Sequence, residues 1–161
     1  MKEIIIVTGA SSGMGREFAM QIEKKYQVDE IWVIARRKER LECLKETLQT
    51  KVKIFALDLT QKESFEIIQE ALFQEKPRVK ALINCSGYGK LDHYENMSIE
   101  VIENMMNLNT KKAIVEKNGQ IDWVTGSFGS KISMLYPMSI LNGEGAKTEY
   151  TGITFAGGGQ N

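Results

Sequence analysis

A glycine-rich run near the start of the chain is the first place where residue types and spacing predict chemistry. The run Thr8-Gly9-Ala10-Ser11-Ser12-Gly13-Met14-Gly15 stands between an apolar, β-branched stretch and a stretch with helical periodicity. Small residues allow a tight turn and a close approach of the backbone to a ligand, and the N-terminus of the following helix attracts anions. The run therefore predicts a binding site for the phosphates of a cofactor, the alternative being a glycine-rich turn that binds nothing.

Arg36 and Arg37 form the second candidate site, because they follow directly on a predicted strand over residues 31–35. In a dinucleotide-binding fold, an acidic side chain at this point accepts hydrogen bonds from the hydroxyl groups of a ribose. Two guanidinium groups instead suit an additional 2′-phosphate, which they bind through charge-assisted hydrogen bonds. We therefore expect NADP(H) as the cofactor rather than NAD(H), the alternative being a solvated basic run at the start of a helix.

Alternating strands and helices must position these two sites. Apolar runs predict strands over residues 3–8, 31–35, 52–57 and 79–85, and amphipathic runs predict helices over 13–27, 38–50 and 61–75, with another after Ser98. Two helices carry an apolar stripe that should face the sheet, made of Leu41, Leu44 and Leu48 in one and of Phe65, Ile68 and Leu72 in the other. Such alternation with short connections predicts an α/β fold with a doubly wound parallel sheet, of which four strands are present.

Four motifs follow one another along the first 112 residues: the turn at 8–15, Asp58 after the third predicted strand, Asn84-Cys85-Ser86-Gly87 after the fourth, and Asn109. On these motifs the segment resembles the N-terminal part of a short-chain dehydrogenase/reductase, which implies a Rossmann-like fold. The resemblance implies that the first turn holds a pyrophosphate, that Asp58 touches adenine, and that Asn109 is a catalytic residue helping to hold a water in a proton relay. The glycine-rich turn, the arginine pair and the resemblance together give the expected cofactor-binding residues. These are Gly9, Ser11, Ser12, Gly13, Met14, Gly15, Arg36, Arg37, Asp58, Leu59, Asn84, Ser86 and Gly87.

The same family uses a serine, and a tyrosine with a lysine four residues later, for acid–base chemistry. A nearby ammonium lowers the pKa of the tyrosine hydroxyl enough for proton transfer. None of the five tyrosines in this chain is followed by a lysine at that spacing. We therefore expect a protein that binds NADP(H) with little or no catalysis. The alternative is an active carbonyl or alcohol oxidoreductase in which Tyr136 or Tyr150 works with a lysine close in space.

Composition excludes other classes of function. Basic and acidic residues number 21 each, which argues against a partner held by bulk positive charge, such as nucleic acid or an anionic membrane. No apolar run is long enough to span a bilayer. The two cysteines cannot form a disulfide framework or a cysteine-rich metal site, Cys43 is expected to pack within its helix stripe, and His93 is expected to be a surface residue. These observations predict a cytoplasmic protein without a metal.

A change in composition near residue 112 predicts two segments. Residues 113–161 hold 9 of the 14 glycines and few of the charges, and apolar and polar residues alternate over 121–125, 131–136 and 148–155. Short strands with tight turns are expected there. We therefore expect a Rossmann half-fold over 1–112, followed by a β-rich segment over 113–161.

The second segment carries its own set of motifs: Gly129-Ser130-Lys131, Tyr136-Pro137, Gly143-Glu144-Gly145-Ala146 and Phe155-Ala156-Gly157-Gly158-Gly159-Gln160. On these it resembles part of the β-helical scaffold of SufB/SufD type from the SUF iron–sulfur assembly system. The resemblance implies two or three β-helical coils, and the absence of cysteine and histidine leaves no cluster ligand to carry over. The two resemblances imply a join near 111–115, which a gene-level fusion, an assembly error or a deliberate chimera would each explain. An alternative function is a scaffold or interaction protein of iron–sulfur assembly, with self-association through exposed strand edges.

Overall fold

The computed structural model describes residues 1–87, 97–109, 112–115, 117–128 and 138–155. The chain divides into two compact units, Met1–Leu108 and Asn109–Asn161. Among the described residues, no helix combines the length and the apolar character needed to cross a bilayer.

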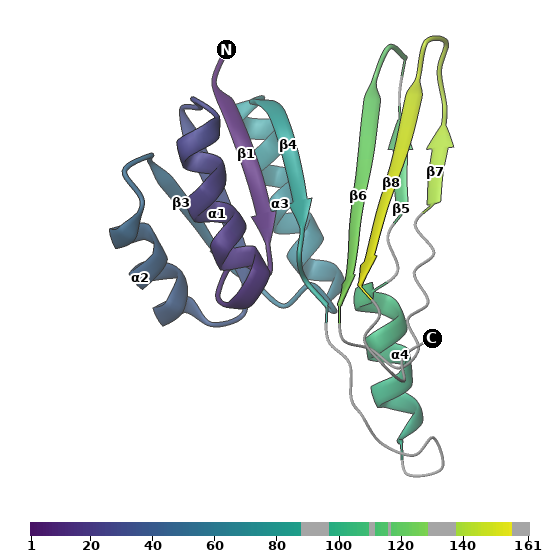
Figure 1. Ribbon diagram of the computed structural model, residues 1–161, viewed down its shortest axis with the longest axis horizontal. Coiled ribbons are helices and arrows are strands. Elements are labelled where there is room, and N and C mark those ends of the chain that lie inside the picture. The colour runs from purple at the N-terminus through teal and green to yellow at the C-terminus, as the bar shows by residue number, and fades with distance from the viewer. Residues whose placement is uncertain (88–96, 110–111, 116, 129–137, 156–161) are drawn as a thin grey trace. The chain divides into compact units, whose positions relative to one another are not determined.

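The first unit is built on a four-stranded parallel sheet (Figure 1). Its strands are β1 (Glu3–Thr8), β2 (Glu30–Ala35), β3 (Val52–Ala56) and β4 (Arg78–Asn84). They lie in the order β3-β2-β1-β4, and each neighbouring pair is parallel. The helices are α1 (Gly13–Lys25), α2 (Lys38–Thr47), α3 (Lys62–Glu75) and α4 (Ile99–Asn109). The predicted parallel sheet is therefore confirmed, with element ends displaced by up to three residues.

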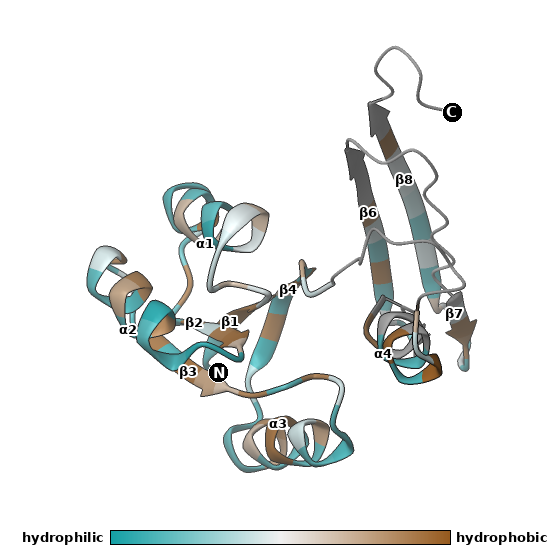
Figure 2. Ribbon diagram, turned by 90° about the horizontal axis from the view of Figure 1, so that it is seen from below, coloured by the Kyte–Doolittle hydropathy of each residue, from teal (hydrophilic) through white to brown (hydrophobic). Residues whose placement is uncertain are grey.

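Helices cover both faces of this sheet, as a doubly wound fold requires. Figure 2 shows α1 and α2 on one side of the strands and α3 on the other. Under α1 and α2, buried Val7 and Val33 pack with Leu41 and Leu44. On the opposite face, the rings of Trp32 and Phe55 lie 5.1 Å apart, and helix α3 packs against them. Because β1 and β2 are buried on both faces, they are continuous apolar runs rather than alternating ones.

Two of the predicted buried side chains are exposed. Leu41, Leu44 and Leu48 are buried as predicted. Phe65, however, is 55% exposed, because α3 packs on the sheet through Ile68, Ala71 and Leu72, which begin one turn later. Cys43 is exposed as well. It stands two positions after Leu41, and the helical twist of 3.6 residues per turn carries it off the stripe.

The second unit consists of parallel strand pairs. Its strands are β5 (Lys112–Val115), β6 (Gln120–Phe128), β7 (Met138–Leu141) and β8 (Lys147–Phe155). Strand β5 pairs with β7 and β6 pairs with β8, so each strand pairs with the next but one, as in a coiled β-helical chain. The runs predicted at 121–125 and 148–155 lie in β6 and β8, whereas 131–136 lies outside the described residues. The short strands β5 and β7 were not predicted.

Candidate functional site

A cleft opens at the carboxyl ends of the strands in the first unit. The first helix leaves the sheet toward one face and α3 covers the other, which opens a crevice at this edge of a doubly wound sheet. The residues that line it are Gly9, Ser11, Ser12, Ala35, Arg36, Arg37, Leu57, Asp58, Leu59, Cys85, Ser86, Gly87 and Leu108. The loops after all four strands therefore meet at one site, although they are up to 78 residues apart in the chain.

The predicted site residues fall into two groups. The first group lines the cleft and consists of Gly9, Ser11, Ser12, Arg36, Arg37, Asp58, Leu59, Ser86 and Gly87. Gly13, Met14 and Gly15 instead form the first turn of α1, Asn84 ends β4, and Asn109 ends α4. The side chain of Asn109 lies outside what the structure describes. Four lining residues were not among the predicted site residues, namely Ala35, Leu57, Cys85 and Leu108, and each of them stands next to a predicted one.

The end of β1 is tied to the end of β4 by a buried hydroxyl. Thr8 Oγ1 accepts hydrogen bonds from the backbone N–H groups of Cys85 and Ser86, each at 3.1 Å. Gly9 follows with a φ of +68°, and its N–H donates to the carbonyl of Ile34 at 2.8 Å. A Cβ atom at Gly9 would lie 2.6 Å from the carbonyl carbon of Cys85. Only glycine fits this close approach, and Thr8, which fixes it, was not among the predicted residues.

The start of α1 is pressed against the same turn. A Cβ atom at Gly15 would lie 2.4 Å from the carbonyl oxygen of Gly9. The backbone at the start of α1 is therefore too close to the backbone of the turn for any side chain at this position. Ser12 is the N-cap residue, but its side chain does not cap the helix. Because no side chain caps the helix, the N–H groups of its first turn and the positive end of its dipole can interact with an anion. This is the geometry that the glycine-rich run predicted.

The side chain of Arg37 reaches back over the turn. Its Nη2 donates to Ser11 Oγ at 3.0 Å and to Ser12 Oγ at 2.7 Å, and its Nε donates to Ser11 Oγ at 3.3 Å. Both acceptors are neutral hydroxyl groups, so they orient the guanidinium without neutralising its charge. A fixed positive charge thus lies beside the uncapped start of α1.

Asp58 presents a carboxylate on the other side of the cleft, after β3. Its Oδ1 accepts hydrogen bonds from the Thr60 N–H at 3.0 Å and from Thr60 Oγ1 at 2.8 Å. Its Oδ2 lies 3.9 Å from Nη1 of Arg36. The Thr60 backbone N–H above all, then the Thr60 hydroxyl and the charge of Arg36, lower the pKa of Asp58 against the opposing effect of its burial. The carboxylate is therefore ionised at neutral pH and can accept a hydrogen bond from a ligand.

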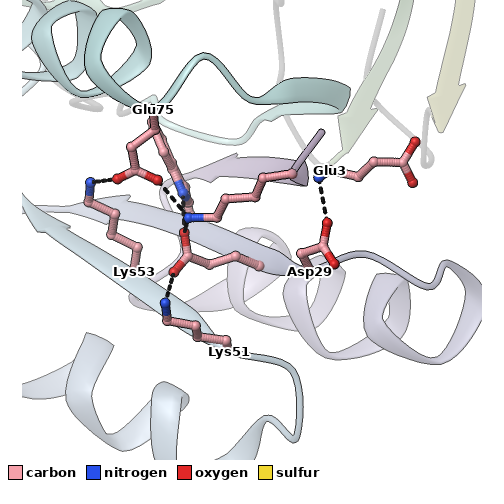
Figure 3. A network of polar contacts seen from close by, with 8 residues as sticks. Glu3, Asp29, Lys51, Lys53 and Glu75 are labelled. Atoms are coloured by element: carbon pink, nitrogen blue, oxygen red, sulfur yellow. Dashed lines mark hydrogen bonds and ion pairs between the residues drawn. The ribbon is translucent and has the colours of Figure 1, made fainter.

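The amino end of the same sheet carries charged groups of a different kind (Figure 3). The side chain of Glu30 is only 3% exposed and contacts Nζ of Lys2. It also accepts a hydrogen bond from Trp32 Nε1 at 2.7 Å, and Nζ of Lys51 lies 3.3 Å away. Burial alone would raise the pKa of Glu30, but the hydrogen bonds, led by that from Lys2, lower it. This buried carboxylate is fully paired within the protein.

Glu75 closes the network from helix α3. Its two carboxylate oxygens lie 2.6 Å from Nζ of Lys2 and 2.5 Å from Nζ of Lys53. These two hydrogen bonds lower the pKa of Glu75 to about 2. The ammonium of Lys53 also lies 4.8 Å from the centre of the Trp32 ring. Helix α3 is thereby fastened to the sheet by charges that are satisfied internally.

The parallel sheet with helices on both faces and a cleft at its carboxyl edge defines a doubly wound α/β fold of Rossmann type, and comparison with known families specifies which family has it. The sequence model of the short chain dehydrogenase family matches residues 3–120. The chain therefore belongs to this family, as its motifs predicted.

Solved structures of this family share the fold of the first unit. One is the short-chain dehydrogenase from Sphingobium yanoikuyae in complex with NADPH, at 27% identity and a TM-score of 0.58 over 66% of this chain and 42% of that chain. Another is the bulky-bulky ketone specific alcohol dehydrogenase from Comamonas testosteroni, at 25% identity and a TM-score of 0.58, over 68% and 44% of the two chains. The chain thus spans less than half the length of these relatives.

The C-terminal part resembles a second family. The SufBD core domain of the SUF system for FeS cluster assembly matches residues 87–161, which overlaps the first match. Iron-sulfur cluster assembly SufBD family proteins of Staphylococcus saprophyticus and Staphylococcus haemolyticus are each 51% identical over 57 residues. That alignment covers 35% of this chain and 12% of each relative. The predicted resemblance of the second segment is confirmed, over a small part of such a protein.

Proposed function

We propose that the cleft of the first unit binds a nicotinamide dinucleotide and prefers NADP(H) to NAD(H). The observation that carries the proposal is the position of Arg37, which its hydrogen bonds to Ser11 and Ser12 hold beside the uncapped start of α1. A pyrophosphate suits the helix start, and a 2′-phosphate suits Arg36 and Arg37. Relatives at 27% identity are described in complex with NADPH and with NADP+, which supports the same cofactor class.

The remaining cleft residues have complementary roles in this proposal. The ionised Asp58 accepts a hydrogen bond from the exocyclic amine of adenine, and Leu59 provides apolar contact beside it. Gly9 and Gly87 allow the cofactor to approach the backbone closely, and Ser86 adds a polar group to the same wall. When bound, the dinucleotide supplies a hydride donor or acceptor, which is the chemistry of this family.

We propose further that this chain binds the cofactor with little or no turnover. No tyrosine has a lysine four residues after it, and Asn109 is the single residue that matches the catalytic group of the family. The alternative, an active oxidoreductase, depends on Tyr136 or Tyr150. Tyr150 lies in β8 and is half exposed, and Tyr136 is outside the described residues. We place the protein in the cytoplasm, where reduced thiols are expected.

Titration of the purified full chain with NADPH, followed by the fluorescence of the cofactor, tests the binding proposal. We expect a saturable change, with NADH requiring higher concentrations. The absence of a saturable change at millimolar NADPH would contradict it. Consumption of NADPH that depends on an added carbonyl compound, and that is lost in Tyr136→Phe or Tyr150→Phe, would instead support the active oxidoreductase.

We also propose that the β-rich segment, about 113–161, is an interaction module with a role similar to that of an assembly scaffold. Its parallel strand pairs and its similarity to the SufBD core support this second function. Affinity capture with the full chain tests it. Retention of an iron–sulfur assembly component or of a second copy is expected, and capture of neither would contradict the proposal.

A further inference from the structure

The charged residues that line the cleft are distributed unevenly over the sheet. The strand order β3-β2-β1-β4 places β2 and β3 on one side of β1 and β4 on the other (Figure 2). Arg36 and Arg37 follow β2, and Asp58 follows β3. The lining residues that the structure describes on the β4 side, 85–87 and Leu108, carry no charge. Electrostatic attraction for a ligand is therefore concentrated on the side of β2 and β3.

This distribution corresponds to one half of a dinucleotide. A dinucleotide spans a doubly wound sheet with its two nucleotides on opposite sides of the point where the strand order reverses. In this sheet the reversal lies between β1 and β4. The arginine pair suits a 2′-phosphate and Asp58 suits adenine, so the phosphoadenosine half belongs on the side of β2 and β3. The nicotinamide half then extends past β4, where none of the described strands pairs with the outer edge of β4.

We propose that this chain recognises its ligand through the adenosine 2′-phosphate 5′-diphosphate half, and that the nicotinamide does not contribute to affinity. The inference rests on the proposed function of the cleft and names its ligand class, which includes nucleotides without nicotinamide, such as 2′-phospho-ADP-ribose. It also implies that NADPH and NADP+ bind equally well. Oxidation adds a positive charge to the nicotinamide ring, and the described lining residues on the β4 side have no charge that would respond to it.

Calorimetric titration of the full chain with NADPH, NADH, 2′-phospho-ADP-ribose and ADP-ribose separates the two halves of the ligand. Removal of the 2′-phosphate should weaken binding about 30-fold, whether or not the nicotinamide is present. Removal of the nicotinamide, or its oxidation in NADP+, should change Kd by less than about threefold. A larger change in either comparison would overturn this inference and leave the proposed cofactor site intact. If none of the ligands bound at millimolar concentration, the proposed function itself would fail.

An arginine variant tests whether NADPH and 2′-phospho-ADP-ribose use the same contacts. Arg37→Lys keeps the positive charge but removes the planar fork of donors, so it should weaken both ligands by the same factor, about tenfold. Arg40→Lys makes the same change within α2, away from the residues that line the cleft, and should leave both Kd values unchanged. Weakening of NADPH and 2′-phospho-ADP-ribose by different factors would overturn the inference.

Collisional quenching provides a further test that needs no substitution. A nicotinamide that extends past β4 stays in contact with solvent, so acrylamide should quench the fluorescence of bound NADPH about as efficiently as that of free NADPH. The anisotropy of the same fluorescence should rise on binding, because the complex tumbles more slowly. Anisotropy thus reports that the cofactor is bound, and quenching reports whether its nicotinamide is covered. A raised anisotropy with protection from acrylamide would overturn this inference, whereas no rise in anisotropy at millimolar NADPH would contradict the proposed function.

Discussion

At the amino end of the parallel sheet the charged side chains are paired with one another, whereas at the carboxyl end they face a cleft. Glu30 and Glu75 share the ammonium of Lys2 and each has a further lysine partner. At the other end, Arg37 donates hydrogen bonds to the hydroxyl groups of Ser11 and Ser12, and Arg36 lies 3.9 Å from the carboxylate of Asp58. Both sets of charges belong to one small fold, but their partners differ.

This difference separates stabilisation from ligand binding. Charges that are buried and satisfied within the protein stabilise the fold when both partners are present, and removing one partner is costly. Charges that are oriented by neutral groups remain able to attract an anion. Substitutions at the amino end should therefore change stability without changing cofactor affinity, and substitutions of the arginines at the carboxyl end should do the reverse.

The largest effect is expected at Gly9, where the backbone of the cleft itself is constrained. Gly9→Ala should lower the free energy of unfolding by about 3 kcal/mol and weaken NADPH more than tenfold, because its Cβ would collide with the Cys85 backbone. Gly13→Ala is the matched control, since Gly13 also has a positive φ but open space around it. It should cost about 1 kcal/mol. If urea unfolding showed the same decrease in the free energy of unfolding for Gly9→Ala and Gly13→Ala, the close approach of Gly9 to Cys85 would not contribute to stability.

The next effect is expected at the amino end. Glu30→Ala should lower the free energy of unfolding by about 3 kcal/mol, because it leaves the Trp32 N–H without its acceptor and removes one of the two carboxylates that contact Lys2. Lys62→Ala, which breaks the exposed pair with Glu66, should cost less than about 0.5 kcal/mol. Under conditions in which both variants are folded, they should bind NADPH with the affinity of the unsubstituted chain. A Glu30→Ala protein that folds normally but loses NADPH would refute the separation of the two ends.

The arginine pair should affect affinity more than stability. Replacing Arg36 and Arg37 together by alanine should weaken NADPH by about 30-fold, or about 2 kcal/mol, and NADH by less than about threefold. The pair Lys38→Ala with Arg40→Ala makes the same change in charge outside the cleft and should leave both affinities nearly unchanged. Equal weakening of NADPH and NADH would contradict a role of the arginines in binding the 2′-phosphate.

The smallest effect concerns acid stability. Because the pKa of Glu75 is about 2 in the folded chain and near 4.5 when unfolded, its contribution is complete above pH 4.5 and is lost as the pH falls toward 2. Glu75→Gln should remove about 1 kcal/mol of this pH dependence between pH 6 and pH 3 in urea unfolding. Substituting Lys2 and Lys53 by methionine, which leaves the carboxylate in place, should reduce the same slope. An unchanged slope in both variants would exclude Glu75 as its source.

Hydrophobic periodicity was sufficient to predict the first unit. The strand runs around Val7 and Val33 are apolar throughout because both faces are covered, and the leucine stripe of α2 lies on the sheet as expected. Periodicity alone did not show how far along α3 the contact with the sheet extends, so Phe65 was wrongly placed inside. Strands β5 and β7 have only four residues each, too few for a recognisable alternation.

The residues of the cleft were largely predictable, but their contacts were not. Short motifs at strand ends identify Gly9, Arg37 and Asp58, because parallel strands bring their carboxyl ends to one edge. The hydrogen bonds of Arg37 to Ser11 and of Thr8 to the backbone after β4 join residues 26 and 77 positions apart. Such pairings depend on strand order and register, which no local pattern contains.

Backbone amide NMR of the full chain during addition of NADPH tests the division between the two ends most directly. Cofactor binding at the carboxyl end predicts that saturating NADPH shifts the amide signals of Gly9, Gly13 and Ser86 and leaves those of Lys2 and Glu75 unchanged. No shifts at millimolar NADPH, or the largest shifts at the amino end, would contradict it.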